Sequence, residues 1–223
     1  MSYDQTLTRV ETYFDKTATK TWERLTSDAP VSKIRETVRR GRDQMRARLL
    51  AELPEDLHGA RVLDAGCGAG PTTIELAARG AHVVAIDISP ALIDIARQRL
   101  PRALYKQVEF CSGDMLAASL GYFDYVVAMD SLIYYSADDI KTALTGLAKR
   151  TSGSVLFTVA PRTRMLMAMW YAGKLFPRSD RSPGMVPHAP AALAALLQGE
   201  GRLRDLGQVK SGFYISQALG FAA

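Results

Sequence analysis

Apolar residues follow two different rhythms along this chain, and the change falls near residue 60. In the first stretch, residues 1–52, they recur at three-, four- and seven-residue spacing with arginines between them, which predicts amphipathic helices. The positions that set this spacing are Val31, Ile34, Val38, Met45 and Leu49. Pro54 closes the stretch, and beyond it short apolar runs alternate with helical patterns. The N-terminal part is therefore expected to be helical and the remainder to be a mixed α/β fold.

Five short apolar runs predict strands that are buried on both faces. They cover residues 61–64, 81–86, 108–111, 125–129 and 155–159. Helical patterns separate them: one over 71–79, one that opens at Ser89-Pro90 and ends before Pro101, and one from Ser136 to about Arg150. Strands that alternate with helices in this way predict a parallel sheet covered on both faces. Residues 208–221 alternate without an intervening helix and predict a closing hairpin.

These patterns divide the chain into successive parts that together fit the size of one α/β domain. We expect a helical cap over 1–52, an α/β core over 53–160, an insertion over 161–190, and a C-terminal helix with the hairpin over 191–223. The insertion is rich in Pro, Arg and Met, and we expect it to lie over the carboxyl edge of the sheet.

Charge and cysteine content narrow the classes of function. The net charge of +5 comes from basic residues mixed with acids rather than interleaved with aromatic residues, so nucleic acid is not the expected partner. Cys67, Cys111 and the separated histidines predict neither a disulfide scaffold nor a protein-bound metal. The first residues lack the pattern of a signal peptide, and the longest uncharged apolar stretch, residues 165–173, is too short to cross a bilayer. We therefore expect a cytoplasmic protein, with peripheral contact to a membrane surface left open.

A glycine-rich loop follows the first predicted strand. It reads Val-Leu-Asp-Ala-Gly-Cys-Gly-Ala-Gly over 62–70, and its glycines let the backbone turn sharply and approach a ligand closely. The spacing G-x-G-x-G differs from the G-x-G-x-x-G of dinucleotide-binding loops, and Asp64 stands two residues before the first glycine. A carboxylate there is unfavourable beside a pyrophosphate and favourable beside an ammonium group. The loop therefore favours a nucleoside ligand with a cationic tail.

Acidic residues also follow the second and third strands. Asp87 lies 17 residues after Gly70, near the offset at which an acid binds ribose hydroxyls. Asp114 is placed to accept from an adenine amino group, and Met115 is placed to pack on the ring. Together with the loop, these residues resemble the S-adenosylmethionine site of class I methyltransferases. The cofactor-binding residues expected on this basis are Asp64, Gly66, Cys67, Gly68, Gly70, Asp87, Ile88, Asp114, Met115, Met129 and Tyr13.

Over nearly its full length the chain resembles a narrower family, the magnesium-protoporphyrin IX methyltransferases of chlorophyll and bacteriochlorophyll synthesis. The specific matches are Val-Glu-Thr-Tyr-Phe-Asp-Lys-Thr-Ala at 10–18 and Leu-Phe-Pro-Arg-Ser-Asp-Arg-Ser-Pro at 175–183, with others at residue 22 and over 31–33, 62–70, 84–89 and 123–135. The resemblance implies a Rossmann-like, mostly parallel seven-stranded sheet whose last strand is antiparallel. It also implies methyl transfer from S-adenosylmethionine to a porphyrin propionate, giving the monomethyl ester. Oxygenic relatives tend to carry His at the position of Tyr134 and Tyr near Thr26, so roles proposed for those side chains do not carry over.

A carboxylate acceptor agrees with the residues present. A propionate has a pKa near that of Glu, ~4.3, so it is already an anionic nucleophile at neutral pH and needs no general base. The catalytic residues therefore stay unassigned, with Asp130 and Tyr134 as candidates for orienting the acceptor. Candidates for holding the porphyrin are Arg162, Arg164, Arg178, Arg181, Trp170 and His188, the last as an axial ligand of the substrate's magnesium. Tyr13, Phe14 and Trp22 are candidates for a lid, whereas Arg35, Arg39, Arg40, Arg42, Arg46 and Arg48 are expected to be solvated helix faces.

Other functions share some of these features. An O-methyltransferase for quinone or phenol precursors would use the same loop, but a phenol of pKa ~10 requires a base or a metal. A non-catalytic S-adenosylmethionine-binding module would keep the loop without an acceptor pocket. An NAD-dependent oxidoreductase is disfavoured by the loop spacing and by Asp64. The pathway that the resemblance implies suggests contact with the magnesium chelatase that makes the substrate. Peripheral contact with the inner or photosynthetic membrane is left open.

Overall fold

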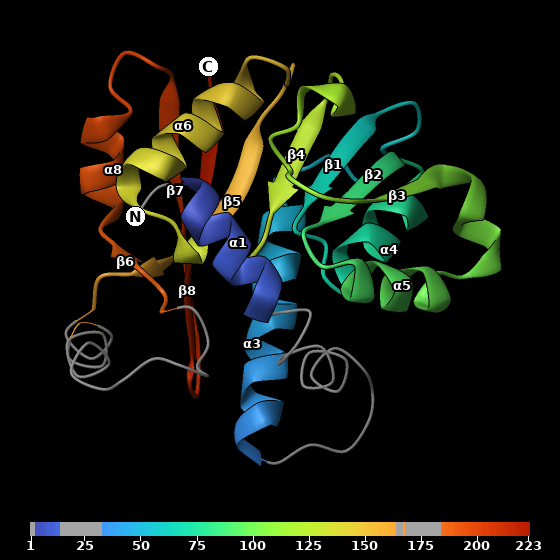
Figure 1. Ribbon diagram of the computed structural model, residues 1–223, viewed down its shortest axis with the longest axis horizontal. Helices are drawn as coiled ribbons and strands as arrows, with labels where there is room; N and C mark the ends of the chain where they lie inside the picture. The colour runs from blue at the N-terminus through green and yellow to red at the C-terminus, as the bar shows by residue number, and fades with distance from the viewer. Residues whose placement is uncertain (1–2, 14–32, 164–166, 168–183) are drawn as a thin grey trace.

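A twisted central sheet organises the molecule, which we describe from a computed structural model over residues 3–13, 33–163, 167 and 184–223 (Figure 1). Its strands are β1 (Arg61–Ala65), β2 (His82–Asp87), β3 (Val108–Ser112), β4 (Tyr125–Ala128), β5 (Val155–Pro161), β6 (Pro187–His188), β7 (Arg202–Ser211) and β8 (Tyr214–Ala222). They are ordered β3-β2-β1-β4-β5-β8-β7, and the two-residue β6 pairs with β5 beside this path. The first five strands pair in parallel, and β8 is antiparallel to both of its neighbours. The expected mostly parallel sheet with an antiparallel last strand is confirmed, and β6 is an addition to it.

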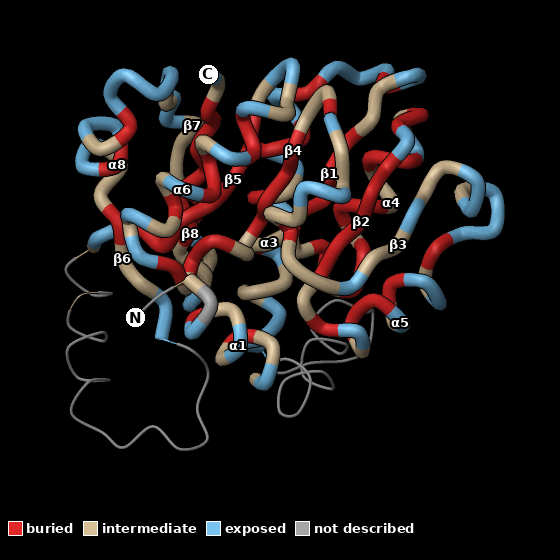
Figure 2. Tube along the Cα trace, turned by 45° about the horizontal axis from the view of Figure 1, so that its top comes forward, coloured by how far each residue is buried: buried red, intermediate tan, exposed pale blue. Residues whose placement is uncertain are grey.

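Helices cover both faces of the sheet. They are α1 (Tyr3–Tyr13), α3 (Lys33–Leu50), α4 (Pro71–Ala78), α5 (Pro90–Arg99), α6 (Ala137–Ala148) and α8 (Pro190–Leu196). One hydrophobic core joins α6 and α8 to one face, and a second joins α3, α4 and α5 to the other. Successive strand residues alternate between the two cores, as with Val62 and Leu63. The inner strands β1, β2, β4, β5 and β8 are mostly buried (Figure 2). Burial on both faces explains why the strands are continuous apolar runs.

Helix boundaries follow local capping chemistry. Ser89 caps α5 by accepting a hydrogen bond from the Leu92 amide at 3.3 Å, and the helix ends before Pro101. Ser136 and Asp139 form a reciprocal capping box at the start of α6. Both helices therefore begin where the sequence predicts.

The closing hairpin is longer than its sequence pattern indicates. β7 starts at Arg202 rather than near Gln208. The sequence pattern misses its first residues because they lie mostly exposed or half-buried along the edge of the sheet. In addition, the register with β8 shifts between Asp205 and Gly207, and such a bulge breaks the alternation of apolar and polar positions. The N-terminal half of this strand therefore lacks a readable period.

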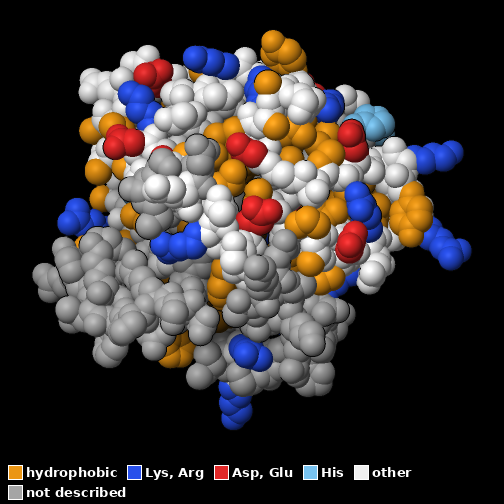
Figure 3. All heavy atoms as spheres, viewed as in Figure 1, with side chains coloured by type: hydrophobic (Ala, Val, Ile, Leu, Met, Phe, Trp, Pro, Cys, Tyr) orange, Lys and Arg blue, Asp and Glu red, His pale blue; other side chains and the backbone are white. Residues whose placement is uncertain are grey.

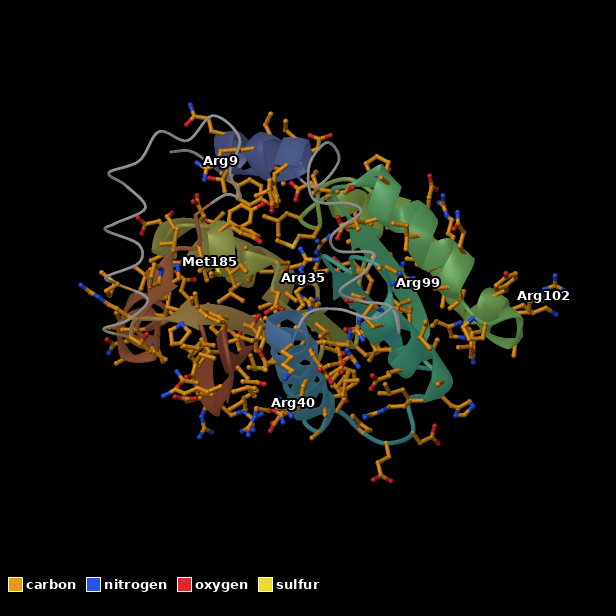
Figure 4. All side chains as sticks on the ribbon, turned by 90° about the horizontal axis from the view of Figure 1, so that it is seen from below. Arg9, Arg35, Arg40, Arg99, Arg102 and Met185 are labelled. Atoms are coloured by element: carbon orange, nitrogen blue, oxygen red, sulfur yellow. The ribbon has the colours of Figure 1, made fainter. Side chains whose placement is uncertain are left out.

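The carboxyl ends of the parallel strands meet at one edge of the sheet, and α1 and α3 both lie at this edge (Figures 1 and 4). Ligand sites in open α/β sheets form at this position. In the part of the chain that the structure describes, no helix is both long enough and apolar enough to cross a membrane.

Candidate functional site

A cavity opens at the carboxyl edge of the sheet. It holds about 660 Å³ of space not filled by protein atoms, part of it open to solvent. Leu7 and Val10 of α1 cover it. Its lining includes these members of the predicted site: Gly66, Gly68, Asp87, Ile88, Met115, Met129, Asp130 and Tyr134. The structure thus brings residues from the ends of β1, β2, β3 and β4 around one space.

The glycine loop needs its glycines for two separate reasons. Gly66, Gly68 and Gly70 have φ angles of 83°, 55° and 84°, in the left-handed region that other residues rarely adopt. Gly66 also has no room for a side chain, because a Cβ there would lie 2.5 Å from the Cβ of Ser131. The loop therefore passes close against the turn after β4 and leaves its backbone facing the cavity.

Asp87 is held by the backbone on both sides. Its Oδ2 accepts from the Gly68 amide at 2.8 Å and its Oδ1 accepts from the Ser89 amide at 2.9 Å. These bonds fix a carboxylate at the end of β2, where an acid is predicted to accept from ribose hydroxyls. The glycine loop and the carboxylate of Asp87 together fit S-adenosylmethionine.

Asp64 lies beneath the loop rather than in the cavity lining. It is 1% exposed, and its Oδ2 accepts from the Thr73 hydroxyl at 2.6 Å. Burial raises the pKa of Asp64 to about 7, and the neighbouring Asp87 adds to this rise while the Thr73 bond opposes it. Its contact with the amino-acid end of the cofactor stays a prediction.

Asp114 is joined to the N-terminal helix by a residue that sequence reasoning missed. The Tyr3 hydroxyl donates to Asp114 Oδ1 at 2.7 Å, and the Leu116 amide donates to the same oxygen at 2.9 Å. The Tyr3 ring stacks on Tyr135 with centroids 5.0 Å apart. Burial raises the pKa of Tyr3, so its hydroxyl stays protonated. No periodic signal marked Tyr3, which stands at the first residue of α1.

The turn after β4 carries a second group of contacts around Asp130. Arg42 Nη1 donates to Asp130 Oδ2 at 2.9 Å, and the Tyr214 hydroxyl lies 3.0 Å from Oδ1. Thr158 Oγ1 donates to Oδ1 at 3.2 Å and accepts from the Asp130 amide at 2.7 Å. Four segments of the chain therefore meet at this carboxylate.

The expectation that the first arginine group forms solvated helix faces is wrong for two of its members. Arg42 lines the cavity, and the half-buried Arg46 pairs with Asp43 and Glu75. Arg48 is exposed as expected and donates to the Leu206 carbonyl. A signal for Arg42 was present in the sequence. It lies four residues after Val38 and three before Met45, on the same helix face as the buried stripe.

Neighbouring polar groups complete this side. Tyr134 lines the cavity, and burial together with Asp130 raises its pKa. Ser131 also lines it, and its buried Oγ has no hydrogen-bond partner in the described part of the chain. His188 is buried, with Nε2 3.0 Å from the Tyr135 carbonyl, and burial lowers its pKa. His188 thus has a structural partner, and its role toward the substrate's magnesium stays a prediction.

The remaining predicted residues lie outside the cavity lining or outside the described residues. Cys67 and Gly70 belong to the loop but do not line the space, and Tyr13 packs with Val10 and Leu92. Arg162 is exposed, and its amide donates to the His188 carbonyl. The residues that fall on segments the structure does not describe are Phe14, Trp22, Arg164, Trp170, Arg178 and Arg181. Within the described ranges, no group of three or more His, Cys, Asp or Glu side chains is arranged to hold a metal ion.

The fold and the site define a class I S-adenosylmethionine-dependent methyltransferase. A methyltransferase-domain family model matches residues 62–152, and the model for the magnesium-protoporphyrin IX methyltransferase C-terminus matches residues 128–222. The magnesium-protoporphyrin O-methyltransferase of Rhodobacter capsulatus is 59% identical over 97% of this chain and 96% of that protein. Its counterpart from Synechocystis is 31% identical over 95% and 94%. This chain belongs to the magnesium-protoporphyrin O-methyltransferase family.

A solved structure supports the same assignment. The crystal structure of magnesium protoporphyrin IX methyltransferase from Synechocystis, with bound S-adenosylhomocysteine, has a TM-score of 0.80 and 29% sequence identity, covering 97% of this chain and 99% of that one.

On the face shown in Figure 3, Lys and Arg side chains are scattered among other residues rather than gathered into one basic surface.

Proposed function

We propose that this protein transfers the methyl group of S-adenosylmethionine to a propionate carboxylate of magnesium-protoporphyrin IX. The products are the monomethyl ester and S-adenosylhomocysteine, and the reaction belongs to bacteriochlorophyll synthesis. The observation that carries the proposal is 59% identity across nearly the whole chain with the Rhodobacter capsulatus enzyme of that name. The cavity with Asp87 and the glycine loop on one side and Arg42 on the other supplies the matching site.

A carboxylate acceptor is already ionised, so the residues around the cavity need not remove a proton from it. When bound, S-adenosylmethionine supplies a methyl group attached to a positively charged sulfur. Tyr134, with its raised pKa, stays protonated at neutral pH and acts there only through hydrogen bonds. Asp130 is engaged by Arg42, Thr158 and Tyr214 rather than available as a base. This arrangement suits an acceptor that is already ionised and disfavours a phenol, which requires a base.

The work left to the protein is positioning and the exclusion of water. Leu7, Val10 and Met129 give the cavity apolar walls, and electrostatic interactions strengthen where water is excluded. Holding two reactants in line can contribute about 7–11 kcal/mol to lowering a barrier. The porphyrin contacts of Arg162, Arg164, Arg178, Arg181 and Trp170, and contacts with magnesium chelatase and a membrane surface, are predictions within this proposal.

The test is methyl transfer from labelled S-adenosylmethionine. Magnesium-protoporphyrin IX, metal-free protoporphyrin IX and a quinol precursor are offered in parallel. We expect label in a base-labile ester on the magnesium porphyrin. Transfer to the quinol alone would support the phenol-directed alternative. Transfer to none of them, with S-adenosylhomocysteine still bound, would support the non-catalytic binding module.

A further inference from the structure

The turn after β3 carries Asp114, the acid predicted to accept from the amino group of adenine. Its neighbours in the chain, Gly113 and Met115, both line the cavity. A Cβ added at Gly113 would meet nothing within 4 Å, so the space beside the turn is open. The Gly113 amide donates to the Asp87 carbonyl at 2.9 Å, which ties the turn to the end of β2. The turn therefore borders a space in which a planar base can lie.

The two carboxylate oxygens of Asp114 are used unequally. Oδ1 accepts from the Tyr3 hydroxyl at 2.7 Å and from the Leu116 amide at 2.9 Å. Oδ2 accepts no hydrogen bond from the part of the chain that the structure describes. A carboxylate oxygen can accept from an exocyclic amino group. One oxygen of Asp114 is thus anchored, and the other stays available to a ligand.

The anchor comes from the helix that covers the cavity. Tyr3 is the first residue of α1, and Leu7 and Val10 of the same helix line the cavity. The Tyr3 ring stacks on Tyr135, with centroids 5.0 Å apart and planes at 27°, and Tyr135 is buried and lines the cavity as well. Docking of α1 therefore closes the cavity and anchors Asp114 together.

We propose that Tyr3 is a positioning residue for base recognition: its hydroxyl orients Asp114 so that Oδ2 accepts from the exocyclic amino group of adenine. Hypoxanthine has a carbonyl at that position, which presents an acceptor to an acceptor. A carboxylate that has lost one anchor distinguishes the two bases less well. The inference rests on the proposed function and deepens it, since it adds a residue to the recognition of S-adenosylmethionine.

The test compares two ligands that differ in the base alone. Binding of S-adenosylhomocysteine and of S-inosylhomocysteine, which carries hypoxanthine, is measured by calorimetry for the wild type and for Tyr3→Phe. We expect the wild type to prefer S-adenosylhomocysteine, and the variant to lose about tenfold of this preference because only the adenine ligand weakens. A preference that is unchanged or larger, whether or not both ligands weaken, would show that Tyr3 only holds α1 in place and would overturn the proposal. A wild type that does not distinguish the two ligands would overturn it as well.

Further variants test whether Tyr3 acts through Asp114. Asp114→Ala removes the carboxylate and should abolish the preference, and adding Tyr3→Phe to it should change the ratio of the two affinities no further. If the Tyr3 hydroxyl still alters that ratio without the carboxylate, it does not act through Asp114 and the proposal fails. Tyr122→Phe, at a ring that is 77% exposed and outside the cavity lining, is the control and should keep the wild-type preference.

Two controls keep the result decisive. Thermal unfolding of each variant identifies any that fails to fold, and Tyr3→Phe keeps the ring that stacks on Tyr135. Both ligands are measured by binding and without methyl transfer. If the wild type methylates no porphyrin, the proposed function fails, but the comparison of the two bases still decides the role of Tyr3.

Discussion

The two sides of the cavity are built from contacts of very different range. On the side of β1 and β2, Asp87 accepts from the amides of Gly68 and Ser89, which are 19 and 2 residues away. On the side of β4, Asp130 meets Arg42 and Tyr214, which are 88 and 84 residues away. One side is therefore completed by a single strand–helix–strand unit, and the other exists only after α3 and the C-terminal hairpin have docked.

This difference separates recognition of the cofactor's nucleoside from the rest of the site. The backbone-held carboxylate of Asp87 depends on local geometry that survives small shifts of α1 or α3. The contacts of Asp130 with Arg42, Thr158 and Tyr214 depend on the relative placement of four elements, so any change in that placement alters the cation that faces the cavity. Variants on the two sides should differ in which ligand they affect.

The largest effect is expected at the local side. Asp87→Ala removes a carboxylate predicted to hold two ribose hydroxyls, and hydrogen bonds to charged groups contribute roughly 1.5–3 kcal/mol each. We expect at least about a hundredfold loss of affinity for both S-adenosylhomocysteine and 5′-methylthioadenosine, measured by calorimetry. Asp94→Ala, which removes an exposed acid paired with Arg97 on α5, is the matched control and should bind both normally. Equal behaviour of the two variants would remove Asp87 from the site.

The next effect tests where the two sides touch. Gly66→Ala would place a methyl group 2.5 Å from Ser131 Cβ at a φ of 83°, whereas Gly68→Ala at a φ of 55° would meet nothing within 4 Å. We expect Gly68→Ala to lower the free energy of unfolding by ~1–2 kcal/mol from backbone strain. Gly66→Ala should lose a further ~1–3 kcal/mol from overpacking. Urea denaturation measures both, and similar losses would mean that the contact with Ser131 relaxes freely.

The difference between contacts that are local in sequence and contacts between distant segments also decides what the sequence predicts. The five parallel strands, the capped helices and the acid that ends β2 follow from patterns within a few tens of residues, and the structure places them as expected. Tyr214 carries no local sign of its role, because its partners come from α3 and from the turn after β4. Arg42 carries a partial sign, as a charged residue within the apolar stripe of its helix, which becomes informative only when the facing carboxylate is known.

Two physical features hid the remaining differences. An edge strand with a bulge loses the period on which strand prediction depends, so the first half of β7 was missed. Conversely, the sequence shows Asp64 only as an acid next to a glycine loop and does not show that its carboxylate is buried. Its burial under α4 depends on Thr73, nine residues further along the chain, which a linear pattern does not reveal.

A smaller effect concerns α1, which closes the local side from outside. Tyr3→Phe removes the hydroxyl that donates to Asp114 and leaves the stacking on Tyr135. We expect amide hydrogen exchange in α1 to accelerate about tenfold, or ~1.4 kcal/mol of local stability, with little change in global unfolding. Tyr122→Phe, at a ring that is 77% exposed, is the control. Unchanged exchange in α1 would mean that apolar contacts alone hold the helix.

The smallest signal comes from the proton on Asp64. With its pKa raised to about 7, the buried carboxyl is partly protonated at neutral pH. A cationic cofactor nearby favours the charged carboxylate and lowers that pKa, so binding should release about half a proton at pH 7. The release should increase toward pH 6 and vanish above pH ~8.5, where the carboxyl is already ionised. Calorimetry with S-adenosylmethionine in buffers of different ionisation enthalpy measures it, and Asp64→Asn should abolish it. Identical apparent enthalpies in all buffers at pH 7 would show that the protonation of Asp64 does not change when the cofactor binds.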